Sequence, residues 1–244
     1  CSPKGRLLAT PRLFQEGDTI GMIVAASNAD YLVKRLKMYV LRSKVTIERA
    51  ADREVLGLVG SAPTNLGDGA LVFELPCALP QARIAAALPS GLGLAIVPKG
   101  TTCAGSDPLW WAACAAAGQS WVFGETAERF TPHAVNLDLI GGISFNKGCY
   151  TGQEVVSRIE HIGKTNRRTV LLAANDPLEL APGTDLTDDQ GQAVATVLYG
   201  AKLADRTLLL AEVSTETAQS EAALDTTAAT LHRLPLPYGW TRTK

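Results

Sequence analysis

Residues 141–158 read G-G-I-S-F-N-K-G-C-Y-T-G-Q-E-V-V-S-R, and glycines recur in this stretch between reactive and polar side chains. Core packing does not require such an alternation. Gly148 and Gly152 bracket Cys149 and Tyr150, so the backbone can turn sharply there and come close to a ligand where a Cβ would obstruct it. The stretch therefore predicts a ligand-binding loop.

Cys149 is the best candidate for a reactive side chain. A helix expected to begin at Gln153 would point free backbone amides toward the loop, and Lys147 adds a positive charge. Both features favour a reactive thiol. A lone cysteine is more often an inert buried group, which is the alternative interpretation. A Cys–His pair would require folding to bring His133 or His161 within hydrogen-bond reach of the sulfur.

The chain before this stretch predicts mixed strands and helices. Strands at 7–14 and 19–25 are expected to form a hairpin, and an amphipathic helix should follow with Asn28 as its N-cap. Further strands are expected at 44–48, 55–59, 70–74 and 92–97, with a helical piece at 81–88.

A second long helix is expected at 107–117. Asp107 is its candidate cap, Pro108 suits its first position and Gly118 its end. Trp110 and Trp111 are interpreted as core residues rather than as a stacking platform. Together with the strands, this helix indicates an α+β fold.

The chain after Thr169 changes character. Short strands are expected at 169–174, 193–199 and 207–213, separated by turn-forming residues, and 214–230 is expected to be a loop or a weak helix. A small β-barrel is a natural way to close such strands. We therefore expect a body over residues 1–164 and a C-terminal β-barrel domain over residues 165–244.

Composition excludes several classes of protein. Lys and Arg number 23 and Asp and Glu number 24, so a net charge of -1 offers no global field for nucleic acid or an acidic membrane. Apolar runs such as 92–98 are far shorter than the roughly 20 residues of a membrane span. Five cysteines with wide, irregular spacing are typical of a reducing compartment, so we expect a cytoplasmic protein. The three histidines are scattered, and the spacing predicts no metal site.

The motif K-G-C-Y-T-G-Q-E at 147–154, preceded by N-L-D-L-I-G-G-I-S-F at 136–145, resembles the signature of YgfZ-type folate-binding proteins. These are relatives of the T-protein (aminomethyltransferase) of the glycine cleavage system. Further matches at 2–8, 124–132 and 163–168 follow in the family's order. The resemblance implies a T-protein-like fold, binding of tetrahydrofolate or a derivative, and a role with iron-sulfur client or assembly proteins.

The resemblance also implies which residues form the site. Cys149 is the key thiol, and Arg168 joins the arginines that could pair with the glutamate tail of a folate. The predicted folate-binding residues are Lys147, Gly148, Tyr150, Gly152, Gln153, Glu154, Lys4, Gly5, Arg6, Arg158 and Arg167.

Three positions depart from the family's pattern. Ala116 stands where relatives commonly have a glutamate that can hydrogen-bond a pterin, and His133 stands where they usually have glutamine. The stretch 6–12 contains no acid, although the T-protein carries an aspartate there for folate chemistry.

Three functions follow as alternatives. The first is a folate-binding accessory protein for the assembly or repair of iron-sulfur enzymes. The second is a tetrahydrofolate-dependent aminomethyl or other one-carbon transferase, against which the missing acid counts. The third is a folate-independent interaction module that presents the Cys149 loop to a partner protein.

Overall fold

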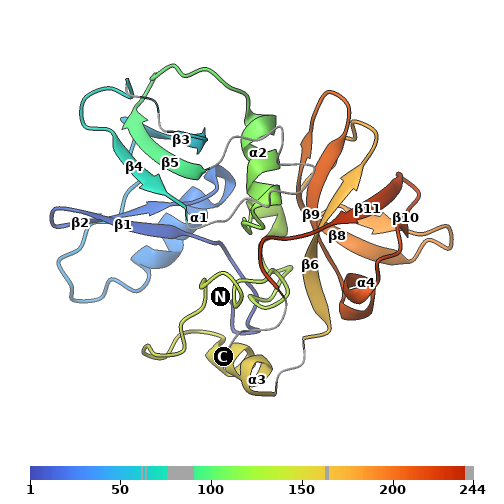
Figure 1. Ribbon diagram of the computed structural model, residues 1–244. Helices are drawn as coiled ribbons and strands as arrows, with labels where there is room; N and C mark the ends of the chain where they lie inside the picture. The colour runs from blue at the N-terminus through green and yellow to red at the C-terminus, as the bar shows by residue number, and fades with distance from the viewer. Residues whose placement is uncertain (62, 64, 76–90, 163–164, 240–244) are drawn as a thin grey trace.

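The computed structural model describes residues 1–61, 63, 65–75, 91–162 and 165–239 (Figure 1). Its first part mixes strands and helices, and strands dominate after residue 166. The elements of the first part are β1 (Arg12–Glu16), β2 (Thr19–Ile23), α1 (Ala26–Lys37), β3 (Arg53–Val59), β4 (Leu71–Glu74), β5 (Leu92–Pro98), α2 (Asp107–Ala116), η2 (Gly124–Thr126) and α3 (Gln153–Ile162). The remaining elements are β6 (Arg167–Ala174), β7 (Asp185–Thr187), β8 (Ala193–Lys202), β9 (Thr207–Ser214), α4 (Thr215–Gln219), β10 (Leu224–Asp225) and β11 (Thr230–Leu234).

The predicted N-terminal hairpin is confirmed as the antiparallel pair β1 and β2, but its first strand is shorter than expected. That strand begins only at Arg12. Pro11 has no amide hydrogen to give to a ladder. The backbone of Leu7 instead donates to Phe130 O at 2.8 Å and accepts from Glu128 N at 2.7 Å. Residues before Pro11 are thereby tied to the middle of the chain.

The predicted cap of the first helix was wrong. α1 begins at Ala26, after an N-cap at Ala25 that makes no side-chain hydrogen bond. Asn28 lies inside the helix with 1% of its surface exposed, and its side chain donates to the carbonyl oxygen of Val122 at 2.6 Å. The side chain of Asn28, which the sequence assigned to the helix start, therefore bonds instead to a buried carbonyl far away in the sequence.

The first body sheet has the order β3-β5-β4, with all pairs antiparallel. It confirms the strands expected near 55–59, 70–74 and 92–97. The strand expected at 44–48 was wrong: within the described chain this segment joins no ladder, and a strand without a partner cannot satisfy its backbone groups through pairing. The helical piece expected at 81–88 lies outside the described residues.

α2 stands between this sheet and the C-terminal strands and contacts both (Figure 1). Its N-cap is Ser106 rather than Asp107, which is the first helical residue, and Gly118 follows its end with φ of +63°. The tryptophan pair is core packing, as expected. Trp110 packs on Gly57 of β3, and Trp111 meets the buried ring of Tyr199 with centroids 5.3 Å apart.

The C-terminal strands form one antiparallel sheet in the order β10-β11-β6-β9-β8-β7, which curls into a half-barrel. The predicted strands at 169–174, 193–199 and 207–213 correspond to β6, β8 and β9. The edges of the curl meet at one backbone hydrogen bond, from Thr227 N to Thr187 O at 2.8 Å. The expected loop or weak helix at 214–230 contains α4 and the short strand β10.

One hydrophobic core serves both parts of the molecule. Leu94 and Ile96 of the body and Leu171, Leu198 and Leu210 of the half-barrel belong to the same buried cluster. Fold class is therefore α+β, as predicted. Among the described helices, none combines the length and the apolar character that crossing a bilayer requires.

Candidate functional site

The predicted loop ends at the start of α3, as the sequence indicated. The carbonyl of Tyr150 accepts from Gln153 N at 3.1 Å, and the Gln153 side chain accepts from Tyr150 N at 3.3 Å. These two bonds close the loop against the first turn of the helix. Lys147 Nζ lies 4.4 Å from the centroid of the Tyr150 ring, and burial raises the pKa of Tyr150. Cys149 is a free, exposed cysteine at the outer side of this turn.

The N-terminal turn packs on the same helix start. Gly152 has φ of +84°, and its Cα faces the backbone of Ser2 and Gly5, so closely that a Cβ there would meet the Ser2 carbonyl. Gly5, with φ of +68°, faces Val155 in turn. The structure thus brings the 2–6 segment together with the 147–154 motif. The close approach that the sequence assigned to a ligand at Gly152 is made by protein backbone.

The predicted basic residues occupy different places. Lys4 and Arg158 are exposed, and Arg6, also exposed, donates to the carbonyl of Arg129. Arg167 Nε donates to Glu212 Oε2 at 2.6 Å across the β6–β9 pair. The guanidinium of Arg167 is therefore already bound by a carboxylate of the half-barrel. Gly148, in the loop, and Glu154, at the start of the helix, are both exposed.

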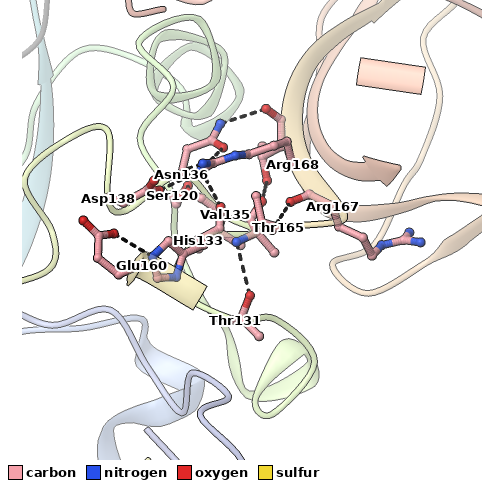
Figure 2. A network of polar contacts seen from close by, with 12 residues as sticks. Ser120, Thr131, His133, Val135, Asn136, Asp138, Glu160, Thr165, Arg167 and Arg168 are labelled. Atoms are coloured by element: carbon pink, nitrogen blue, oxygen red, sulfur yellow. Dashed lines mark hydrogen bonds and ion pairs between the residues drawn. The ribbon is translucent and has the colours of Figure 1, made fainter. Parts of the chain in front are cut away.

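Arg168 belongs to a buried network that joins the half-barrel to the turns before the motif (Figure 2). Its guanidinium donates to both carboxylate oxygens of Asp138, at 2.7 and 3.0 Å, and to the carbonyl of His133 at 2.8 Å. The Asp138 and Arg168 side chains are 5% and 12% exposed. Asn136, with φ of +58°, adds a bond from its amide to Thr169 O at 2.8 Å.

His133 faces the last turn of α3, where its Nε2 lies 3.0 Å from Glu160 Oε2 (Figure 2). The His133 side chain is 3% exposed and Glu160 18%. Sequence reasoning singled out His133 but missed Glu160 and Asp138. The sequence did offer one signal for Glu160: this residue lies at the far end of the helix that was predicted to follow the motif.

A second polar group that sequence reasoning missed lies among the aromatic rings of the core. The Arg12 guanidinium lies 3.8 Å from the centroid of the Trp121 ring and donates to Gln119 Oε1 at 3.0 Å. Burial lowers the pKa of Arg12 and raises that of Tyr199, whose hydroxyl donates to Gln119 O at 2.6 Å. Ala116, the departure from the family's glutamate, is buried at the end of α2.

Two concave regions border the half-barrel. One of about 550 Å³ lies between α4 and β11, and one of about 230 Å³ continues along β11 toward Tyr238. No described residue of the 147–154 motif lines either region. These hollows are thus separate from the loop that carries Cys149.

The arrangement of a mixed body, a spanning helix and a curled C-terminal sheet is a T-protein-like fold. The chain superimposes on the glycine cleavage system aminomethyltransferase T from Bartonella henselae with a TM-score of 0.65, covering 97% of this chain and 73% of that one at 11% identity. No protein-family model matches the sequence.

Proteins related to this chain in sequence identify its family. The chain is 31% identical over 263 residues to the tRNA-modifying protein YgfZ of Yersinia pestis (strain Pestoides F), which covers 98% of this chain and 79% of the relative. It is 32% identical over 262 residues to the protein of the same name from Shigella boydii serotype 4 (strain Sb227), covering 98% and 80%. The chain belongs to the YgfZ family.

Proposed function

We propose that this chain binds tetrahydrofolate or a derivative and supports the assembly or repair of iron-sulfur enzymes, with Cys149 as its key thiol. One observation carries the proposal: the 147–154 motif and the 2–6 turn meet at the start of α3 on a T-protein-like fold. Exposed Lys147, Lys4 and Arg158 supply local positive charge in a protein of net charge -1.

The folate part is supported by the fold and by the chemistry of the motif. A reduced folate is an anion with carboxylates on its glutamate tail, for which lysine and arginine are suitable partners. Arg158 and Lys147 are exposed and lie at or near the motif helix, whereas Arg167 is engaged by Glu212. We therefore propose that the glutamate tail of the folate pairs with Lys147 and Arg158 in preference to Arg167.

Calorimetric titration with tetrahydrofolate tests this assignment. We expect saturable heat from the wild type and affinity about tenfold lower or worse for Lys147→Ala, because a charged hydrogen bond is lost. Lys99→Ala, which removes an exposed lysine at the end of β5, is the matched control and should bind as the wild type does. Absence of heat from the wild type would overturn folate binding.

The role of Cys149 is tested by its reactivity and by complementation. We expect iodoacetamide to alkylate Cys149 faster than Cys103, which is also exposed. Each cysteine lies four residues before a helix, but Lys147 is two residues from Cys149 whereas Lys99 is four residues from Cys103. Equal rates at the two cysteines would contradict activation. In a host lacking its own family member, Cys149→Ala should fail to restore the activity of a [4Fe–4S] enzyme that Cys103→Ala restores.

A one-carbon transferase is the second candidate. Transfer to or from a folate nitrogen requires an acid or base beside it. The 6–12 stretch contains no acid, and the guanidinium of Arg12 lies there among aromatic rings instead. Formation of 5,10-methylenetetrahydrofolate from an aminomethyl donor, at a rate that Cys149→Ala leaves unchanged, would favour the transferase over the accessory role.

The name of the relatives refers to tRNA modification. A net charge of -1 gives this chain no global positive field that would attract the phosphates of tRNA. We therefore infer that any contribution to tRNA modification runs through an enzyme that this chain supports. Salt-dependent binding of unmodified tRNA by the purified chain would contradict that inference. A complex with a partner protein that forms without folate would instead support the third alternative, the folate-independent interaction module.

A further inference from the structure

We propose that His133, Asp138 and Glu160 form a binding site for a divalent transition-metal cation, best suited to Zn²⁺, beneath the motif helix. This inference goes beyond the proposed function, which assigns no metal site to this chain. The donor atoms of the three side chains all lie within 4.8 Å of one another (Figure 2). His133 and Glu160 have already approached to 3.0 Å.

The donor set matches the chemistry of zinc. One imidazole nitrogen and two carboxylate oxygens are ligands that Zn²⁺ takes, and three protein ligands leave the fourth tetrahedral position for water. Bond lengths of about 2.0–2.2 Å separate tetrahedral ligands by roughly 3.4 Å. Donor atoms that lie within 4.8 Å of one another must therefore close by at most about 1.4 Å to reach this geometry.

Burial favours a site over a chance surface cluster. The side chains of His133 and Asp138 are 3% and 5% exposed, and that of Glu160 is 18% exposed. Carboxylates gathered on a surface are mostly solvated, whereas two of these three side chains are almost fully buried. Glu160 is the most exposed of the three side chains, so a cation would enter the site from its side.

Arg168 serves as the outer partner of the proposed site. It holds Asp138 through two hydrogen bonds and the backbone of His133 through a third. A carboxylate has about four lone-pair positions, so Asp138 can accept from Arg168 and still ligate a cation. Fixing two ligands through neighbouring hydrogen bonds is how proteins orient metal sites.

A bound cation would have a mechanical consequence for the motif. Glu160 lies in the last turn of α3, whose first turn closes the Cys149 loop, while His133 and Asp138 belong to the turns that Arg168 ties to β6. The cation would replace the contact between His133 and Glu160 by two metal bonds. It would therefore fix the motif helix to the body and the half-barrel.

Titration of the whole chain with Co²⁺, a spectroscopic substitute for Zn²⁺, tests the proposal. Cysteines are first blocked with iodoacetamide so that thiolate ligation cannot contribute. We expect a visible d–d absorption band that saturates at one equivalent and is abolished by Zn²⁺, and a higher Tm with Zn²⁺ than without it. Glu160→Gln, at the partly exposed position, should weaken Co²⁺ binding at least about tenfold while leaving the far-ultraviolet circular dichroism unchanged.

His133→Gln, which introduces the residue usual in the family, should have the same effect on Co²⁺ binding as Glu160→Gln. His161→Gln, beside Glu160 on the exposed face of α3, is the matched control and should keep the wild-type band. No band from the blocked wild type would overturn the proposal. So would a band that both His133→Gln and Glu160→Gln retain while His161→Gln removes it.

Discussion

At the scale of single residues, Gly148 and Gly152 lie in one loop but meet different surroundings. A Cβ at Gly148 would have nothing within 4 Å. At Gly152 the φ of +84° is costly for any other residue, and a Cβ would lie 2.9 Å from the Gly5 Cα as well as against the Ser2 carbonyl. Of these two glycines, only Gly152 is required by the fold.

Gly152→Ala is expected to lower the free energy of unfolding by about 2 kcal/mol or more, combining backbone strain with displacement of the 2–6 turn. Gly148→Ala should change it by less than about 0.5 kcal/mol. Urea unfolding of both variants measures the difference. Equal losses at the two positions would show that the packing of the 2–6 turn on α3 contributes nothing to stability.

At the scale of elements, one ion pair connects the start of β6 to the turns that precede the motif. Arg168 and Asp138 form it with two hydrogen bonds at low exposure. A buried pair is expensive to break because the remaining charge stays desolvated. This pair therefore fixes where the motif segment sits against the half-barrel.

Arg168→Ala is expected to destabilise the chain by about 3–5 kcal/mol. The comparison is Lys202→Ala, which removes a surface pair with Glu179 whose side chains are 44% and 83% exposed, and which should cost about 0–1 kcal/mol. Denaturant midpoints of the two variants decide between a structural and a merely superficial pair. A loss below about 1 kcal/mol for Arg168→Ala would rule out the connecting role.

At the scale of the whole molecule, the proposed division at residues 164 and 165 separates chain segments that share a core. Leu171, Leu198 and Leu210 of the half-barrel pack in one cluster with Leu94 and Ile96 of the body. Cutting the chain would expose this apolar face to water. We therefore expect residues 165–244 not to fold as an independent unit.

The fragment 165–244 is expected to be less stable than the whole chain and to associate in solution. Circular dichroism during urea unfolding, together with light scattering, compares the two proteins at equal concentration. A monomeric fragment that unfolds cooperatively at the midpoint of the whole chain would contradict this expectation and make the half-barrel an autonomous domain.

Tyr238 ties the end of the described chain to the end of α2, and it gives the molecule a stability change at alkaline pH. Its hydroxyl donates to Gly118 O at 3.0 Å, and burial raises its pKa to about 12. Between about pH 10 and about pH 12 the unfolded chain loses a proton that the folded chain keeps. The free energy of unfolding must therefore fall as pH rises through that window, by at most about 3 kcal/mol from this group.

Tyr238→Phe should remove this part of the pH dependence, whereas Tyr39→Phe, at an exposed ring, should preserve it. Urea unfolding of both variants and of the wild type at about pH 9 and about pH 11.5 provides the comparison. If the free energy of unfolding falls by the same amount between these two pH values in the wild type and in Tyr238→Phe, this hydroxyl is not buried in solution.

Local sequence determined the α+β class, the N-terminal hairpin, the helix that begins at Gln153, the core role of the tryptophan pair, and the motif through which the family is recognised. These features depend on residues within a few positions of one another, through turn chemistry, periodicity and glycine geometry. Tertiary structure alone decided that Asn28 serves Val122 rather than a helix start, that 44–48 finds no strand partner in the described chain, and that Gly152 faces the 2–6 turn. It also decided that His133, scattered among the histidines of the sequence, lies beside Asp138 and Glu160. Such contacts join segments far apart in the chain, and they are selected by burial and by the pairing of polar groups across the whole fold, which no local pattern encodes.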